Sequence, residues 1–474
     1  MYFACSAGTN IDFALLFANR TVKLKRRRSA AGSAGSSGSA GAFDGTRLRH
    51  WPGERQQAPA KPLQTGRKTC GTKANDGSGR PIKFLNVTKL PLSLRPVKTM
   101  PEIKPIQMVD LAGQYRRLKT EIDAGLEQVM LQASFINGPA VKTFATELEA
   151  YLGVKHVIPC ANGTDAIQIA LMALNLPEGS EIITPGFSYI ALAEACALLK
   201  FRPVFADVDP DTFNLDPLQI EKHITPRTKV IAPVHLFGQS ADMETILAIA
   251  EKHNLYVLED NAQSIGADYT FSDGKTCKTG TMGHVGTTSF FPSKNLGCYG
   301  DGGAVTTNDP VLAENVRMIA NHGQKVKYIH DTVGVNSRLD SMQAAVLSVK
   351  LKHLDSFNSD RRTVAKAYDE AFRDIQGVKI PSKYKKSTHV YNQYTLQMPG
   401  VDIEDFRSYL QKQGVPTMIY YPLPIHKQKA YEENISLPVS ETLCSSVVSL
   451  PIGTEMEQSQ VDYIIENVKN YFKL

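Results

Sequence analysis

The sequence predicts an α/β fold: a mainly parallel, seven-stranded sheet flanked by helices, followed by a smaller C-terminal α/β domain. The first observation is that short apolar or β-branched runs alternate with stretches that carry apolar residues at helical spacing. The second is that these runs are apolar at consecutive positions, which is typical of strands buried on both faces. In such folds the reactive residues stand at the carboxyl ends of the strands and in the loops after them.

Taken in order, seven runs are predicted to be strands: His156–Cys160, Glu181–Thr184, Pro203–Ala206, Val230–Val234, Tyr256–Glu259, Thr288–Phe291 and Ala304–Thr307. Helical spacing predicts helices before and between them, at Ile122–Leu131, Phe144–Leu152, Asp165–Leu174, Ile190–Leu199 and Met243–His253. A helix from Ser341 to Leu354 then leads into a remainder of mixed short strands and helices. We therefore expect a large domain over residues 101–355 and a small C-terminal domain over residues 356–474.

Residues 1–100 differ in composition from the rest. They hold 18 Lys and Arg against 4 Asp and Glu, whereas the remainder holds 35 against 43, so the net charge of +6 combines a basic arm with a mildly acidic body. Residues 29–42 are a Gly/Ser/Ala tract that cannot build a packed core, so we expect a disordered arm. The basic run at residues 23–28 fits a nuclear or nucleic-acid signal, but a solvated charge run is commoner in such an arm. A transit peptide, or a true start of translation at Met100, are the other interpretations of the arm.

The seven cysteines are scattered and form no CxxC pair. This pattern argues against a disulfide framework and against a zinc site, so we expect reduced thiols and no bound metal. No apolar run approaches the roughly 20 residues that a membrane span needs. We therefore expect a cytoplasmic protein with neither a membrane nor a nucleic acid as its partner.

Asn162, Gly163 and Thr164 follow a predicted strand and open a predicted helix. A turn of small residues at a helix N-terminus presents free backbone N–H groups and a favourable dipole to a phosphate, and the Thr164 hydroxyl adds a donor. The same residues also make an ordinary turn with a helix cap. Taken alone, the motif leaves both interpretations open.

Asp260 stands at the end of the most apolar predicted strand, and Gln263 follows three residues later. A carboxylate in that place needs a cationic partner or several hydrogen bonds. A protonated pyridine nitrogen is such a partner, because Asp260 would keep the ring able to accept electrons from a substrate carbanion. Gln263 could then reach the ring hydroxyl. The alternative is an aspartate that caps the next helix.

Lys294 lies in a Gly-rich loop between two predicted strands, outside the helical context of most solvated lysines. A lysine nucleophile forms a Schiff base with a carbonyl, and burial lowers its pKa for that task. Ser289, on the strand before the loop, could bind phosphate. The alternative is a surface-loop lysine.

The three motifs come in the order phosphate turn, acid strand, lysine loop, which is the order of a fold-type I enzyme that uses pyridoxal phosphate. From about Val109 to the C-terminus the sequence resembles the DegT/DnrJ/StrS family of sugar aminotransferases, whereas residues 1–100 are unmatched. The motifs that carry the resemblance are NGTDA (162–166), TPGFSYIA (184–191), PVFADVDPDTFNLD (203–216), VHLFGQSADM (234–243), EDNAQSIGA (259–267), SFFPSKNLGCYGDGGA (289–304) and GVNSRLDSMQAA (334–345).

The resemblance implies a catalytic role for Lys294, which carries pyridoxal 5'-phosphate as a Schiff base in this family. It also implies that Asp260 pairs with the ring nitrogen and that Gln263 touches the ring hydroxyl. Tyr189 matches an aromatic residue that stacks on the ring, with a core tyrosine as the alternative. Having Lys and not His at position 294 separates the chain from the deoxygenating branch of the family.

The phosphate of the cofactor has its own matching positions, which are Gly163, Thr164 and Ser289. Asn336 matches a phosphate contact that the neighbouring subunit supplies in the family. The resemblance therefore implies a homodimer with shared active sites.

Residues 322–324, 334–340 and 420–426 resemble the branch that makes 3-amino sugars from UDP-linked 3-keto hexuronates. In that branch Arg338 and His426 lie near the sugar, and the planar fork of an arginine suits a uronate carboxylate. A helix-exposed arginine and an ordinary loop histidine are the alternatives. The implied reaction is transamination from L-glutamate to UDP-2-acetamido-2-deoxy-3-oxo-hexuronate, which yields a 3-amino sugar for polysaccharide or O-antigen precursors. A 4-keto-sugar or aminocyclitol aminotransferase, and a non-catalytic regulatory or sensor protein of the same fold, remain the other hypotheses.

Overall fold

The structure is a computed structural model that describes residues 103–431 and 433–474. Its central sheet has seven strands in the order β1-β9-β8-β5-β4-β2-β3. β2 pairs with β3 and β4 in parallel, and β5 pairs in parallel with β4 and β8. β9 runs antiparallel to both β1 and β8. The prediction of a mainly parallel, seven-stranded sheet is confirmed. The predicted arm, residues 1–100, lies outside the described residues.

The strands of this sheet are β1 (His156–Cys160), β2 (Glu181–Pro185), β3 (Arg202–Ala206), β4 (Thr228–Ile231), β5 (Tyr256–Asp260), β8 (Val285–Ser289) and β9 (Gly303–Thr307). Two predicted ranges were wrong by more than one residue. β4 ends at Ile231 and not at Val234, because Pro233 has no N–H to continue the ladder. β8 begins three residues earlier than predicted, because Gly286 interrupts the apolar pattern that marks a strand.

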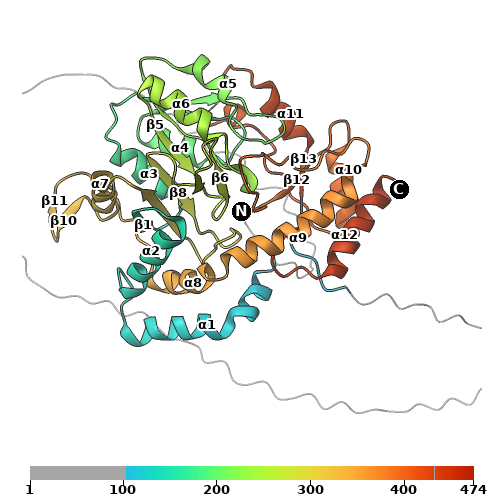
Figure 1. Ribbon diagram of the computed structural model, residues 1–474, viewed down its shortest axis with the longest axis horizontal. Helices are drawn as coiled ribbons and strands as arrows, with labels where there is room; N and C mark the ends of the chain where they lie inside the picture. The colour runs from blue at the N-terminus through green and yellow to red at the C-terminus, as the bar shows by residue number, and fades with distance from the viewer. Residues whose placement is uncertain (1–102, 432) are drawn as a thin grey trace, which may run out of the picture. The chain divides into compact units, whose positions relative to one another are not determined.

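Helices cover both faces of the sheet (Figure 1), and the alternation of neighbouring strand residues shows which helix lies where. Ile182, Val230 and Leu258 pack in one cluster with α3, α4 and α7. Ile183, Ile231 and Val257 point the other way and pack with α6, while α2 and α8 cover the β1–β9 end of that second face. The helices of this part are α1 (Leu111–Gln132), α2 (Pro139–Leu152), α3 (Gly163–Ala173), α4 (Ala191–Leu198), α5 (Pro217–Ile220), α6 (Met243–His253), α7 (Pro310–Ala320) and α8 (Ser341–Leu351).

The C-terminal part contains an antiparallel pair, β12 (Tyr394–Gln397) and β13 (Val447–Leu450). It packs with α9 (Leu354–Phe372), α10 (Ile403–Lys412) and α12 (Gln458–Tyr471) around a separate apolar cluster, while α11 (Pro438–Ser446) leads into β13. Figure 1 shows α9 following α8 closely and carrying the chain from the central sheet toward β12 and β13. The helix predicted over Ser341–Leu354 ends at Leu351. The domain boundary predicted after residue 355 falls in the first turn of α9. The described residues belong to one compact unit, so that boundary stays a prediction.

Two small hairpins complete the fold: β6 (Asp268–Thr270) with β7 (Thr276–Lys278), and β10 (Gln324–Val326) with β11 (Ile329–His330). Across residues 103–474, with residue 432 left aside, no helix combines the length and the apolar character needed to cross a bilayer. The five cysteines in the same part of the chain are free. No cluster of His, Cys, Asp or Glu suited to a metal ion was found among these residues.

Candidate active site

Helix α3 begins directly after β1 with an open N-terminus. The Asn162 side chain caps the helix by accepting from the Asp165 N–H at 2.8 Å. This cap leaves the N–H groups of Gly163 and Thr164 without a partner inside the helix, as at any helix start. The first turn of α3 therefore offers backbone donors and a positive dipole end to an anion, as the sequence predicted.

Ser289 lies against this helix start. A Cβ placed on Gly163 would come within 2.7 Å of the Ser289 Cβ, so only glycine allows the end of β8 to approach α3 this closely. The Ser289 side chain is half-buried, and its Oγ accepts from the Phe291 N–H at 3.3 Å. The structure thus brings together Gly163, Thr164 and Ser289, the three residues predicted to hold a phosphate.

Asp260 ends β5 with its side chain buried. Its Oδ1 accepts from the Ala262 N–H at 3.0 Å. Burial raises the pKa of this carboxyl, and the nearby Lys294 ammonium works in the opposite direction. A buried carboxylate at the carboxyl end of a parallel strand is therefore available to a cation, which agrees with the role predicted for it.

Lys294 lies in the loop between β8 and β9, and its backbone N–H donates to Phe291 O at 2.8 Å. Desolvation lowers the pKa of its half-buried ammonium to about 8, while the charge of Asp260 raises it. The Nζ makes no hydrogen bond or ion pair within the described chain. A lysine with these properties is largely a free amine in mildly basic solution, and a free amine can attack a carbonyl.

Two buried side chains hold the lysine loop in place. Asn295 donates from Nδ2 to Asn358 Oδ1 at 2.7 Å and to Val390 O at 2.9 Å. Lys350, which has no exposed surface, donates from Nζ to Gly297 O at 2.7 Å. The loop is therefore tied to α8 and α9. Neither contact was predictable from the sequence, because nothing in a sequence pairs residues so far apart.

Gln263 accepts from the Phe237 N–H through Oε1 at 2.8 Å. Its Nε2 donates to the Tyr421 hydroxyl at 3.0 Å, which leaves a second N–H for another acceptor. The Tyr421 ring lies 6.3 Å from the ring of Tyr189, which is 60% exposed and so is not a core tyrosine. Tyr421 therefore lies next to both Gln263 and Tyr189. The motif at 420–426 was noted in the sequence, but its contact with Gln263 was not foreseeable.

Asn336 and Arg338 lie on the segment before α8. Asn336 is exposed and forms a bridge with Asn321, while the next residue, Ser337, accepts from the Ala161 N–H at 3.1 Å beside the α3 N-terminus. Arg338 is half-buried, and within the described chain its guanidinium has no hydrogen bond or ion pair. The roles predicted for these two residues stay predictions.

His426 is fully buried, and its Nε2 lies 3.0 Å from Glu441 Oε1. The preceding residue, Ile425, donates its N–H to Gly186 O at 2.9 Å. The histidine therefore lies next to the segment that joins β2 to Tyr189. Its Nδ1 is buried and has no partner in the described chain. No hydrogen bond or ion pair there joins His426 to Lys294, Asp260 or Gln263. A substrate contact by His426 stays a prediction.

The chemistry of this donor set fits pyridoxal phosphate. The α3 N-terminus and Ser289 suit the phosphate, the buried Asp260 suits a protonated ring nitrogen, and the free N–H of Gln263 suits the ring oxygen. Lys294, with its lowered pKa, suits the aldehyde carbon. The exposed ring of Tyr189 is free to stack.

Relatives of known sequence match most of the chain. The chain is 45% identical to a "Pleiotropic regulatory protein" of Geobacillus stearothermophilus over 375 residues, which cover 78% of this chain and 99% of the relative. It is also 45% identical to a UDP-2-acetamido-2-deoxy-3-oxo-D-glucuronate aminotransferase of Pseudomonas aeruginosa over 366 residues, 77% of this chain and 100% of the relative. A dTDP-3-amino-3,4,6-trideoxy-α-D-glucose transaminase of Streptomyces venezuelae is 38% identical over 374 residues, 78% of this chain and 97% of the relative.

Two solved structures are similar along the same stretch. S. venezuelae DesV, in complex with a ketimine intermediate, matches with a TM-score of 0.75 and 38% identity over 78% of this chain and 100% of the other. NtdA from Bacillus subtilis, with bound cofactor PMP, matches with a TM-score of 0.73 and 31% identity over 79% and 86% of the two chains.

The model of the DegT/DnrJ/EryC1/StrS aminotransferase family matches residues 116–469, which include every predicted site residue. That match covers most of the chain, and the P. aeruginosa relative at 45% identity is named an aminotransferase. The chain belongs to the DegT/DnrJ/EryC1/StrS aminotransferase family and is an aminotransferase.

Proposed function

We propose that this protein uses pyridoxal phosphate to transfer the amino group of L-glutamate to the keto group of a nucleotide-linked sugar. The observation that carries the proposal is the pair formed by Lys294, with its pKa lowered to about 8, and the buried Asp260. When bound, pyridoxal phosphate supplies a carbonyl that takes up the amino group and a ring that accepts electrons from the carbon that loses its proton.

The residues of the chain then have separate tasks. Asp260 keeps the ring nitrogen protonated, Gln263 donates to the ring oxygen, and Tyr189 covers the ring face. With cofactor and donor bound, the amine of Lys294 would remove the proton from the α-carbon of glutamate. It acts as general base there and as general acid when it returns a proton, which a pKa near the operating pH favours.

We further propose UDP-2-acetamido-2-deoxy-3-oxo-hexuronate as the amino acceptor, with a 3-amino sugar for polysaccharide synthesis as the product. The P. aeruginosa relative, at 45% identity, supports this substrate. Arg338 supports it as well, since a half-buried guanidinium without a partner in the described chain can take a carboxylate. The S. venezuelae relative, which acts on a dTDP-linked sugar, favours the second candidate, an acceptor without a carboxylate.

A regulatory or sensor protein is a candidate of another class, and the name of the G. stearothermophilus relative favours it. The presence of Lys294 together with Asp260 and Gln263 argues against it, because a sensor without turnover need not keep all three. Turnover with glutamate and any keto sugar separates the two classes.

The deciding experiment incubates the protein with pyridoxal phosphate, L-glutamate and the UDP-linked 3-keto hexuronate and follows the masses of the products. We expect the sugar to carry an amine in place of the ketone, with 2-oxoglutarate formed in equal amount. Initial velocities should give parallel lines, since the donor product leaves before the acceptor binds. If only a dTDP-linked sugar is aminated, the proposed acceptor is wrong and the second candidate holds. If no keto sugar is aminated, the proposed reaction is wrong.

We also propose that two copies share their active sites through Asn336. Its exposed position beside the α3 N-terminus supports a contact with a second chain. Mixing an inactive Lys294→Ala protein with an Asn336→Ala protein should restore part of the activity if the sites are shared. Light scattering should give twice the mass of the chain, and a monomer that is fully active would contradict the proposal.

A further inference from the structure

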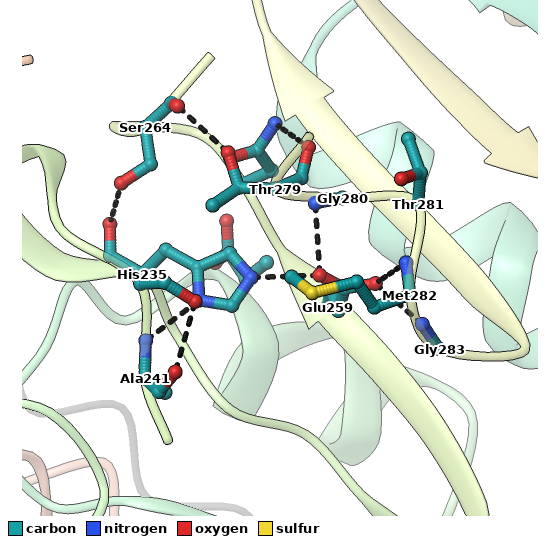
Figure 2. Close-up of polar contacts among 12 residues, drawn as sticks. His235, Ala241, Glu259, Ser264, Thr279, Gly280, Thr281, Met282 and Gly283 are labelled. Carbon is teal, nitrogen blue, oxygen red and sulfur yellow. Dashed lines mark hydrogen bonds and ion pairs between the residues drawn. The ribbon is translucent and has the colours of Figure 1, made fainter. Parts of the chain in front are cut away.

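Behind Asp260 lies a buried carboxylate that the reaction does not use. Glu259, the preceding residue on β5, has no exposed surface and points to the opposite side of the strand. Its Oε2 accepts from His235 Nε2 at 2.9 Å and from the Gly280 N–H at 2.8 Å. Its Oε1 accepts from the N–H groups of Met282 and Gly283, at 2.6 and 2.5 Å (Figure 2). Both oxygens are therefore fully used as acceptors.

His235 has one definite tautomer in this arrangement. The Ala241 N–H donates to its Nδ1 at 3.1 Å, so the proton of the neutral ring is on Nε2 and is donated to Glu259 (Figure 2). The backbone of His235 is held as well: its N–H donates to Asp260 O at 3.0 Å, and its carbonyl accepts from the Ser264 hydroxyl at 2.8 Å. The histidine thus bonds to the side chain of Glu259 and to the main chain of Asp260, at the end of β5.

These bonds join three segments that are far apart in the chain, residues 235–241, 259–264 and 279–283. The first segment supplies the Phe237 N–H that orients Gln263, and the second contains Asp260 and Gln263 themselves. The third leads directly into β8, which ends at Ser289. One buried pair therefore fixes the strand ends from which the predicted contacts to the ring and the phosphate project.

The kind of donor that holds Glu259 has an electrostatic consequence. Glu181, another buried carboxylate of the same sheet, stands at the amino end of β2 and is held by Arg227 at 2.6 Å. Within the described chain Glu259 has no such cation and is held by neutral donors. Lys294 already supplies a positive charge near Asp260, and a further cation held by Glu259 would also compete with a protonated ring nitrogen for that carboxylate. A second negative charge at Glu259 instead favours the protonated nitrogen.

We propose that His235 and Glu259 are positioning residues: they fix Asp260 and Gln263, and they add a negative charge that keeps the cofactor ring protonated at Asp260. The inference rests on the proposed function and extends it to residues that contact neither cofactor nor substrate. It predicts that changing Glu259 alters the protonation of the bound cofactor and not only the stability of the fold.

The test compares Glu259→Gln with Glu181→Gln, a matched buried glutamate at the other end of the sheet. Each protein is loaded with pyridoxal phosphate, its absorbance is titrated with pH, and its melting temperature is measured without added cofactor. We expect E259Q to move the midpoint of the absorbance titration and to weaken cofactor binding roughly tenfold, as for outer partners of other bound groups. We expect E181Q to lower the melting temperature and to leave the titration unchanged.

A second series protects the test against a variant that does not fold. His235→Gln keeps an N–H for Glu259 and should retain more of the wild-type titration than His235→Ala. Ser264→Ala removes only the hydroxyl that holds the His235 carbonyl and should give a smaller shift in the same direction. If Glu259→Gln, or all three milder variants, titrate like the wild type, the inference is wrong while the proposed function stands. If the wild type binds no pyridoxal phosphate, both are wrong.

Discussion

Lys294 and Asp260 influence each other's charge at the carboxyl ends of β8 and β5: the aspartate raises the pKa of the lysine, and the lysine lowers that of the aspartate. For both groups, burial is the larger effect and acts against the charged form. The result is an amine with a pKa of about 8 beside a carboxyl whose pKa is raised. The two groups suit the carbonyl and the ring nitrogen of the proposed cofactor.

The first prediction concerns pH. The rate at which the cofactor-free protein takes up pyridoxal phosphate should rise with pH with a midpoint near 8, because only the neutral Lys294 attacks a carbonyl. Asp260→Asn removes the charge that raises the lysine pKa, so its midpoint should lie at lower pH. Stopped-flow absorbance across about pH 6 to 10 measures both. The exposed Asp273→Asn serves as control, and a midpoint that rises in Asp260→Asn would contradict the coupling.

Lys294→Ala should abolish transamination while leaving cofactor binding in place. The loss of the general base alone costs about 10²- to 10⁴-fold in rate. Asp260, Gln263 and the α3 N-terminus remain, so the protein should still retain pyridoxal phosphate through desalting but release it on denaturation. Lys366→Ala, on the exposed face of α9, should behave like the wild type. Activity of Lys294→Ala within tenfold of the wild type would show that another residue moves the proton.

Gly163→Ala should weaken cofactor binding without unfolding the protein. The added Cβ would lie 2.7 Å from the Ser289 Cβ, so the end of β8 and the start of α3 must separate where a phosphate would sit. We expect a roughly tenfold rise in the dissociation constant, equal to about 1.4 kcal/mol. Gly125→Ala, whose Cβ meets Ala345 Cβ only at 3.7 Å, should leave binding unchanged and stabilise α1 by about 0.5–1 kcal/mol. Equal cofactor affinity of Gly163→Ala and Gly125→Ala would show that the phosphate does not bind at the α3 N-terminus.

Arg338→Gln should separate the uronate from other acceptors. Losing a charge-assisted hydrogen bond to a carboxylate costs about 1.5–3 kcal/mol, so the KM for the uronate should rise roughly 10- to 100-fold. The KM for L-glutamate should change little, and so should that for the same sugar without its carboxylate. Steady-state kinetics on the three substrates provide the comparison. An equal rise in KM for both sugars would show that Arg338 stabilises the fold and does not bind the carboxylate.

Much of the fold followed from local patterns in the chain. Consecutive apolar residues marked β1, β2 and β5, and the turn at residues 162–164 marked the start of α3, because burial on both faces and helix capping are properties of short segments. The predicted strands were less accurate where Gly286 or Pro233 broke the pattern. The order of the phosphate turn, Asp260 and Lys294 was also visible in the sequence, and it is the order of a fold-type I enzyme that uses pyridoxal phosphate.

The sequence by itself determined which residues are chemically able to act, and only the tertiary structure decided how they are held. Gln263 bonds to Tyr421, Lys350 to Gly297 and His235 to Glu259, although each pair is separated by many residues of chain. Desolvation of Lys294 likewise depends on what packs around it, and burial of His426 depends on α11. Periodicity and turn chemistry act over a few residues, whereas hydrogen bonds and burial arise between segments that meet only when the sheet and its covering helices have packed.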